Sequence, residues 1–383
     1  MNPVPPTINR VEVFPVGLPV TRTFRFASGS AVGVGQRASM AFVKVTASDG
    51  QVGWGAGRPL PQWSYETIES VVTTLRGYLA PAVAGVEIWD AQGLEHRMFA
   101  AVGRGPSTGQ PVAKSALDTA LWDLRAKAAG VPLRCLLGGA SAHAPMRLSW
   151  TCTAHSAAEM RDDIAEGKAQ GFTDFNFKAA VDPRTDLEIA RVLLDQTAPD
   201  AFRWADCNQG FHLSDAVRVA RAFEELGIGV LEQPLAADQF PPMAELRRHT
   251  ALPLAVDEST VSDADFFRHA AAGVVDFLVV KVPRSGGITP TLRQIATARS
   301  AGLRLLVSGL TDPFLSKVAA LQVAAAHGVT HPSALNGSQF LDESALFPQK
   351  AAMETGGAVT LSDRPGIGVE PDEAALRALA LAL

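Results

Sequence analysis

The sequence has few cysteines and lacks the pattern of a secreted protein. Three cysteines, Cys135, Cys152 and Cys207, occur in 383 residues, too few and too scattered for a disulfide framework or a C-x-x-C site. The first residues contain no basic segment followed by an apolar one, as a signal peptide would require. These absences predict a protein of a reducing compartment, the cytoplasm.

Long apolar runs and clusters of positive charge are also missing. No run approaches the ~20 apolar residues that span a bilayer, so we do not expect a membrane protein. The chain carries 34 basic and 39 acidic residues, a net charge of −5, with no basic block, which argues against a nucleic-acid partner. The composition is that of an ordinary globular protein, and the length suggests a large domain with a smaller one.

What is present falls into two patterns along the chain. Residues 8–57 alternate apolar and polar side chains on both sides of an Asp49-Gly50 turn, which predicts an antiparallel sheet. Helical patterns follow, among them residues 113–130, which end on a glycine as helices often do. We therefore predict an α+β domain over residues 1–130.

After about residue 140 short apolar runs alternate with Ala-rich amphipathic segments. Eight such runs predict a closed parallel barrel of the (β/α)8 type, which we place at residues 131–358. The alternative is an open doubly wound sheet, but no G-x-G-x-x-G phosphate loop follows the first run. The runs are 146–152, 174–178, 202–207, 229–234, 252–258, 275–282, 303–309 and 332–337.

Charged residues end five successive runs of the predicted barrel. The carboxyl ends of barrel strands face one pocket, so we expect these side chains to meet there. A single charged strand end is usually a rim or salt-bridge residue, but five on successive strands are hard to obtain by chance. Runs two and six end in lysines and runs three to five in carboxylates: Lys178, Lys281, Asp206, Glu232 and Asp257-Glu258.

Three carboxylates at one rim repel one another and need a compensating cation. Because the strand-end ligands are all carboxylate oxygens, they favour Mg²⁺, with Mn²⁺ or Ca²⁺ as alternatives. Burial and a nearby dication both lower the pKa of an ammonium group, so Lys178 and Lys281 are candidate general bases. A carboxylate substrate bound to the metal would lose its α-proton because the cation stabilises the enediolate.

These motifs resemble the enolase superfamily, in its muconate-lactonizing-enzyme-like branch, over essentially the whole chain. The resemblance implies a TIM-like barrel with an N-terminal α+β capping domain, which residues 359–383 return to complete. It rests on Gly53-Trp54-Gly55, on the segment 113–139, and on the strand ends Asn176-Phe-Lys178, Asp206-Cys-Asn208, Glu232-Gln-Pro234, Asp257-Glu258 and Lys281.

The resemblance also implies roles for the strand-end residues. Asp206, Glu232 and Asp257 would bind Mg²⁺. Lys178 and Lys281 would stand on opposite faces of the substrate α-carbon. A lysine or histidine base acting with Mg²⁺ is an established feature of this superfamily.

The sequence departs from the family pattern at positions that bear on the substrate. Asn176 replaces the first lysine of the usual K-x-K, which would change how Lys178 is tuned. Asn336 and its neighbours replace the D-x-D with which dipeptide epimerases hold an ammonium, which argues against a free-amine dipeptide. Strand seven carries no histidine and offers only Asp312. Predicted substrate contacts or supporting residues are Asn176, Asn208, Glu258, Asp312, Trp63, Trp150 and Asn336.

Three functions remain open from the sequence. Two lysines on opposite faces permit a racemase or epimerase of a small amino-acid-derived carboxylate, such as an N-substituted amino acid or a betaine. Cycloisomerisation of a muconate-like acid, or dehydration of a hydroxy acid, needs only one lysine as acid or base. A metal-stabilised binding protein without turnover is the third. We expect loop 24–30 to be a lid and the chain to form a homo-oligomer.

Overall fold

The N-terminal part of the computed structural model contains the antiparallel sheet that the alternation predicts. The structure describes residues 5–26, 29–30, 33–103, 108–141 and 144–383. The sheet has the order β1-β4-β5, and β4 turns back into β5 at a glycine with positive φ. Its strands are β1 (Ile8–Pro19), β4 (Arg37–Ala47) and β5 (Val52–Gly57), and β2 (Arg25–Phe26) with β3 (Gly29–Ser30) forms a separate short hairpin.

Helix α5 (Pro111–Ala128) lies directly against β5, because glycines on the strand permit an unusually close approach. A Cβ atom at Gly53 or Gly55 would stand only 2.2 or 2.1 Å from a carbonyl oxygen of α5. The remaining helices of this part are α1 (Pro61–Ser64), α2 (Ile68–Thr74), the π-helical turn Leu75–Leu79, α3 (Ala80–Val83), α4 (Ala91–Ala101) and α6 (Leu133–Leu136).

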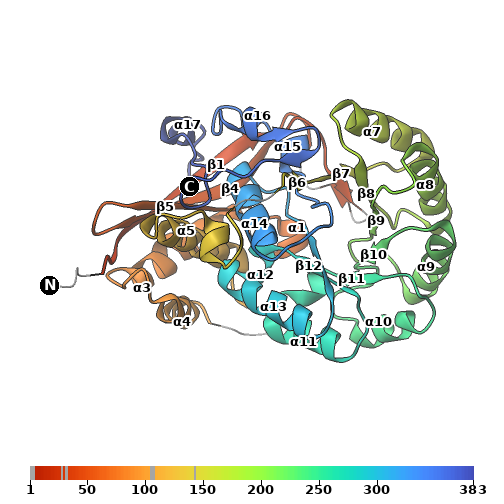
Figure 1. Cartoon of the computed structure of the whole chain (residues 1–383), viewed down its shortest axis with the longest axis horizontal. Helices are drawn as coiled ribbons and strands as arrows, with labels where there is room; N and C mark the ends of the chain where they lie inside the picture. Colours follow the sequence, from red (N-terminus) through yellow and green to blue (C-terminus); the bar gives the residue numbers. More distant parts are fainter. Residues whose placement is uncertain (1–4, 27–28, 31–32, 104–107, 142–143) are drawn as a thin grey trace.

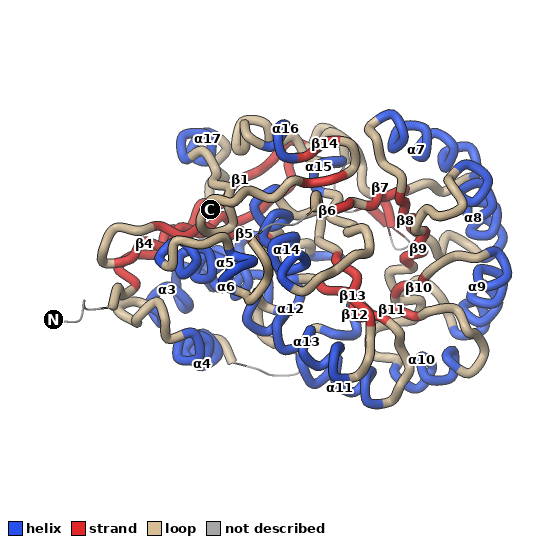
Figure 2. Tube along the Cα trace, in the orientation of Figure 1, coloured by secondary structure: helices blue, strands red, loops and turns tan. Residues whose placement is uncertain are grey.

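The barrel is built on a seven-stranded parallel sheet that runs in sequence order from β7 to β13. Figures 1 and 2 show its strands inside a ring of helices. The eighth predicted strand is reduced to bridges at Ser333 and Ala334, which join the two outer strands and close the ring. The strands are β7 (Ser149–Cys152), β8 (Asp174–Lys178), β9 (Arg203–Asp206), β10 (Val230–Glu232), β11 (Leu254–Val256), β12 (Phe277–Val280) and β13 (Arg304–Val307).

Seven helices follow the strands in turn and cover the outside of the barrel (Figure 2). No helix in the described part of the chain is long and apolar enough to cross a membrane. The helices are α7 (Ala157–Ala169), α8 (Pro183–Gln196), α9 (Leu213–Leu226), α10 (Phe240–Arg247), α11 (Asp263–Ala271), α13 (Ile288–Ser300) and α14 (Phe314–Ala326), with the short turns Glu258–Thr260 and α12 (Val282–Ser285) between them.

The end of the chain returns to the N-terminal sheet (Figure 1). Gly17 N–H donates to Leu379 O over 3.1 Å, and Leu381 N–H donates to Pro15 O over 2.9 Å, so these residues extend the edge of β1. Between the barrel and the chain end lie α15 (Gly337–Phe340), α16 (Lys350–Met353), β14 (Glu354–Thr355), β15 (Ala358–Val359) and α17 (Glu373–Ala378). Strand β15 pairs with β6 (Met146–Arg147), which precedes the barrel.

Candidate active site

The ends of β8, β9 and β10 bring three predicted site residues into one row. Lys178 pairs in register with Asp206, and Asp206 pairs with Glu232. Residues in register on neighbouring parallel strands point to the same face, so the three side chains lie side by side. All three are buried. The apolar runs therefore carry their last residues to a common, water-poor place.

Asp257 and Lys281 join this row from the ends of β11 and β12. The Lys281 ammonium donates to Asp257 Oδ2, and Arg284 Nη1 donates to Asp257 Oδ1 over 2.6 Å. All three side chains are buried. The role of Arg284 was not predicted from the sequence. The only sequence feature that could have indicated Arg284 is its position, three residues after the strand-end Lys281. In the structure this position lies in the helical turn α12.

Lys178 is held by a chain of polar contacts that reaches the capping domain. Its ammonium donates to Asp206 Oδ2, and to Asn208 Oδ1 over 2.9 Å. Asn208 Nδ2 donates in turn to Glu258 Oε1 over 3.1 Å, and the Trp63 indole donates to the same oxygen over 2.8 Å. The structure thus brings Asn208, Glu258 and Trp63 to the lysines, where the sequence predicted them.

A small cavity lies between the two lysines. Its volume is about 20 Å³, room for about one water molecule. A carboxylate substrate is larger, so part of the wall must move before one binds. Two of its residues come from the predicted lid loop 24–30, of which Ala27 and Ser28 lie outside the described residues. The lining is Phe24, Phe26, Leu60, Trp63, Lys178, Asn208, Lys281, Gly309, Leu310 and Thr311.

An aromatic ring backs each lysine in this cavity. The Lys178 ammonium lies 5.2 Å from the centre of the Phe24 ring, and the Lys281 ammonium lies 4.5 Å from the ring of Trp63. Ring faces attract cations at such distances. Both rings belong to the N-terminal part, so the capping domain helps to position both lysines.

Burial and neighbouring charges shift the pKa values of the acids in opposite directions. Burial, followed by repulsion from neighbouring carboxylates, raises the pKa of Glu232 well above its usual range and that of Glu258 to about 7. Burial also tends to raise the pKa of Asp257. The positive charges of its partners Lys281 and Arg284 outweigh this effect, so the pKa of Asp257 is lowered. The site therefore contains acids of very different strength within one cluster.

The lowered lysine pKa expected from the sequence is not found at Lys281. Burial lowers the pKa of its ammonium, but the attraction of Asp257, Glu232 and Glu258 is stronger, and the net shift is upward. The expectation assumed a dication beside the lysine, which would offset the attraction of these carboxylates. In this arrangement Lys281 is a charged ion-pair partner.

Oxygen atoms suited to a divalent cation are present, although ion pairs now separate them. Within the described ranges no three carboxylate, imidazole or thiolate groups converge on one point, and Asp206 and Asp257 each hold a lysine instead. Glu232 Oε1 is buried with no hydrogen-bond partner among the described residues, which is costly for a carboxylate oxygen. An orphaned oxygen beside two further carboxylates fits a hard cation such as Mg²⁺.

Asn176 and Asn336 meet through Thr151, a residue not predicted from the sequence. Asn176 Oδ1 accepts a hydrogen bond from the Thr151 hydroxyl over 3.0 Å, and Asn336 Nδ2 donates to the same hydroxyl oxygen over 3.3 Å. Asn176 stands two residues before Lys178 on β8, so both face the barrel interior. The result is an uncharged polar wall below Lys178.

Two other predicted residues do not line the lysine cavity. Trp150 packs on the outside of the barrel, with its ring centre 5.1 Å from that of Phe172. Neighbouring residues on a strand face opposite sides, so Thr151 takes the inward position. Asp312 accepts a hydrogen bond from Leu310 N–H over 2.7 Å, behind the turn that lines the cavity.

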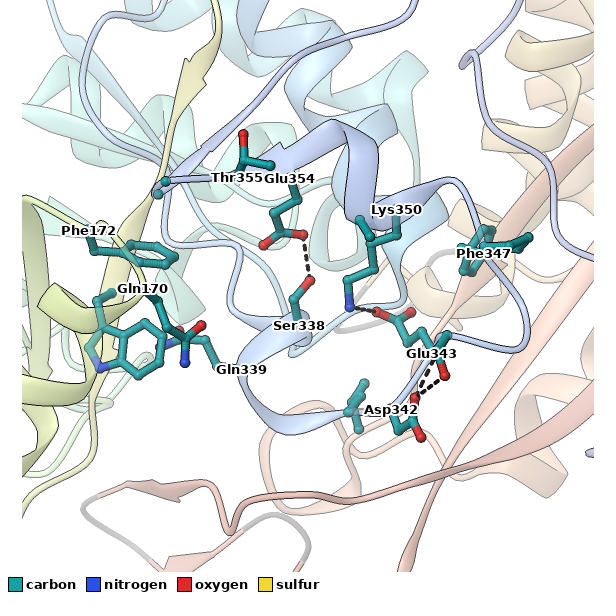
Figure 3. A pocket seen from close by; sticks show the side chains of 17 residues that line it. Gln170, Phe172, Ser338, Gln339, Asp342, Glu343, Phe347, Lys350, Glu354 and Thr355 are labelled. Carbon is teal, nitrogen blue, oxygen red and sulfur yellow. Dashed lines mark hydrogen bonds and ion pairs between the residues drawn. The ribbon is translucent and has the colours of Figure 1, made fainter.

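A larger cavity, of about 360 Å³, lies outside the barrel between Trp150 and residues of the segment 338–357. Figure 3 shows Glu354 next to Ser338 and Lys350 next to Glu343 along its wall. The two strand-end lysines and the three acids proposed to bind a metal do not line this cavity. The larger space is therefore separate from the candidate chemistry.

A capped parallel barrel with lysines and carboxylates at its strand ends defines an enzyme of the enolase type. Residues 159–375 match the family described as "Enolase C-terminal domain-like", and residues 12–138 match "Mandelate racemase / muconate lactonizing enzyme, N-terminal domain". The chain belongs to this mandelate racemase and muconate lactonizing enzyme family, and the resemblance seen in its motifs is confirmed.

Relatives with named activities span nearly the whole chain. It is 28% identical over 378 residues to chloromuconate cycloisomerase of Pseudomonas putida, which covers 97% of this chain and 98% of the relative. It is 29% identical over 364 residues to the L-Lys-D/L-Arg epimerase of Methylococcus capsulatus, with 94% and 99% covered. Both relatives are isomerases, and the chain is an enzyme of this type.

A solved structure shares the complete fold. The N-succinyl Arg/Lys racemase of Bacillus cereus superposes with a TM-score of 0.89 at 22% identity, covering 98% of both chains. At 22% sequence identity, this structural similarity shows only that the two chains share a fold. It confirms the predicted TIM-like barrel with an N-terminal capping domain.

Proposed function

We propose that the chain is a Mg²⁺-dependent racemase or epimerase of an amino-acid-derived carboxylate, in which Lys178 and Lys281 exchange the α-proton. The observation that carries this proposal is that both lysines line one cavity, although they come from β8 and β12. Two-base chemistry requires one lysine to remove the proton and the other to deliver it on the opposite face.

The acids between the lysines would hold the cation. Asp206, Glu232 and Asp257 supply oxygen ligands, and Glu232 Oε1 already lacks a partner within the described residues. When bound, Mg²⁺ would supply electrostatic stabilisation for the negative charge that develops as the α-proton leaves. The lysines themselves hold and move that proton, and the Phe24 and Trp63 rings keep them in position.

The polar wall below Lys178 supports a neutral substituent on the substrate. Thr151, Asn176 and Asn336 offer hydroxyl and amide groups, and Asn336 Oδ1 is buried with no partner among described residues. An amide pairs with a neutral hydrogen-bonding group, such as the acyl group of an N-acylated amino acid, without the cost of burying a charge. This wall favours an N-substituted amino acid over a free amine.

Cycloisomerisation of a muconate-like acid is the second candidate. The near-complete alignment with chloromuconate cycloisomerase, at 28% identity, supports it. That reaction would use one lysine as acid or base and leave the other as a fixed positive charge. The two candidates differ in whether both lysines must titrate.

The test is incubation with Mg²⁺ in D₂O and a library of N-substituted amino acids, betaines, muconates and hydroxy acids. Deuterium at the α-carbon together with both configurations in the product is the expected result. Ring closure or loss of water without racemisation would favour the second reaction class. A chain that binds Mg²⁺ but catalyses no α-proton exchange, ring closure or loss of water with any member would refute both and leave a binding protein.

A further inference from the structure

Trp204 lies inside the barrel directly beneath the candidate metal ligands. It stands two residues before Asp206 on β9, so its side chain faces the interior as Asp206 does, and it is only 1% exposed. Its apolar cluster includes Ala255 and Ala334. These small side chains leave room for an indole in a layer of the barrel that larger residues would otherwise fill.

The Trp204 indole N–H donates to Glu232 Oε2 from the neighbouring strand. An indole N–H is a donor only, and when buried it needs an acceptor. Glu232 Oε2 is thus engaged from below, whereas Oε1 of the same carboxylate has no hydrogen-bond partner within the described residues. The two carboxylate oxygens of Glu232 therefore differ: Oε2 is hydrogen-bonded and Oε1 is available to a ligand.

We propose that Trp204 is a positioning residue that fixes the Glu232 carboxylate for a divalent cation, an inference that rests on the proposed function. The bond to Oε2 restricts rotation of the carboxylate about its last side-chain bond. It leaves Oε1 as the oxygen available to the cation. Groups that hydrogen-bond to metal ligands typically change metal affinity by 10–100-fold when removed.

A purely structural role would be filling the barrel, and a second tryptophan separates the two roles. Trp150 is also 1% exposed, but it packs outside the barrel and its indole N–H has no partner among the described residues. Trp204→Phe and Trp150→Phe both remove part of a buried ring. Only Trp204→Phe removes a hydrogen bond to a candidate ligand.

The experiment is isothermal titration calorimetry, in which each full-length variant is titrated with Mg²⁺ alone. We expect Trp204→Phe to raise the Mg²⁺ Kd about tenfold, while Trp150→Phe leaves it within twofold of the unmodified chain. Both variants should lower Tm, because both lose packing. Equal Mg²⁺ affinity in Trp204→Phe and the unmodified chain would overturn the inference and leave Trp204 as packing only.

A further measurement covers the case in which Trp204→Phe does not fold. Trp63 is the other tryptophan whose indole contacts a site carboxylate, so Trp63→Phe removes its signal. In the ¹⁵N-labelled Trp63→Phe chain, one remaining indole N–H resonance should shift on addition of Mg²⁺. Absence of any shift in a chain that binds Mg²⁺ overturns the inference. If the unmodified chain binds no Mg²⁺, the metal in the proposed function is itself wrong.

Discussion

Glu66, which precedes α2 in the chain, is a fully buried carboxylate that packs against the first turn of α5. Its oxygens accept hydrogen bonds from Val112 N–H over 2.7 Å and from Ala113 N–H over 3.2 Å. Burial outweighs these bonds and raises the pKa of Glu66 from 4.5 to about 7. The folded chain therefore holds this proton more tightly than the unfolded chain, so stability is full below pH 4.5 and falls as the pH rises through 7.

Glu66→Gln should remove this part of the pH dependence. The shift of about 2.5 pKa units corresponds to about 3 kcal/mol. Relative to the unmodified chain, the variant should gain about that much unfolding free energy between pH 4 and pH 8. Urea denaturation at both pH values measures it. A difference between the two proteins that stays constant with pH contradicts the assigned pKa.

At the scale of elements, the contact of β5 with α5 depends on glycine. A Cβ atom at Gly55 would lie 2.1 Å from Ala116 O and 2.7 Å from Ala120 N. Both are backbone atoms of a helix, so they cannot turn aside as a flexible side chain could. The strand and helix would have to separate, at the expense of the buried cluster between them.

Gly55→Ala should therefore destabilise the chain by more than about 3 kcal/mol, a large effect for one methyl group. Gly77→Ala is the matched control, because a Cβ there meets nothing within 4 Å and alanine is favoured within a helix by about 0.5–1 kcal/mol. Thermal unfolding of both variants is the measurement. A Gly55→Ala chain as stable as Gly77→Ala would show that the close approach is unimportant.

The turn between β13 and α14 is held by an arginine from the capping domain. Arg58 is buried and donates to Leu310 O over 2.7 Å and to Thr311 O over 3.1 Å. Thr311 has φ 56°, a conformation that is unusual for a β-branched residue. Strained residues of this kind gather at functional sites, and Leu310 and Thr311 line the lysine cavity.

Arg58→Met should loosen this turn. Two buried carbonyl groups lose their donor, which costs about 2–4 kcal/mol, and amide hydrogen exchange at residues 309–312 should accelerate. Arg37→Met is the control, because Arg37 also donates to two carbonyls but is exposed, and both acceptors, Gly17 O and Leu379 O, lie outside this turn. Exchange at residues 309–312 that is unchanged in Arg58→Met would refute the role of Arg58.

At the scale of the whole molecule, the sequence predicted the barrel because its strands are apolar runs with regular helical segments between them. It predicted the candidate site because Lys178 and Asp206 stand at the ends of two neighbouring strand-like runs. The eighth strand was overestimated, since only Ser333 and Ala334 pair. An apolar run in the sequence does not show how many of its residues will form hydrogen-bonded pairs with a neighbouring strand.

Other site features depend on three-dimensional neighbours that a linear pattern does not contain. Trp150 was predicted as a substrate contact or supporting residue, but it faces outward, because a shift of one residue along a strand reverses the face. Trp204 and Thr151 are ordinary strand residues in sequence, and their roles come from partners on adjacent strands. Arg58 acts across the boundary between two domains. The domain boundaries placed after residues 130 and 358 stay predictions.

A cation held by the strand-end acids should stabilise the whole folded chain. At a Mg²⁺ concentration 100-fold above Kd the gain is about 2.7 kcal/mol, visible as a rise in Tm. Glu232→Gln should lose most of this gain. Glu343→Gln, a change at an equally buried acid beside the outer cavity, should keep it. An equal Mg²⁺ response in all three proteins would place the cation elsewhere.

The most direct measurement of the two-lysine account is deuterium exchange of each substrate enantiomer in Lys178→Ala and Lys281→Ala. With Mg²⁺ in D₂O the unmodified chain should exchange the α-proton of both enantiomers, and Lys44→Ala, on the capping sheet, should match it. Each site variant should stop racemising and retain exchange with at most one enantiomer, opposite for the two variants. Racemisation at the unmodified rate in either variant, or exchange of the same enantiomer in both, would contradict the account.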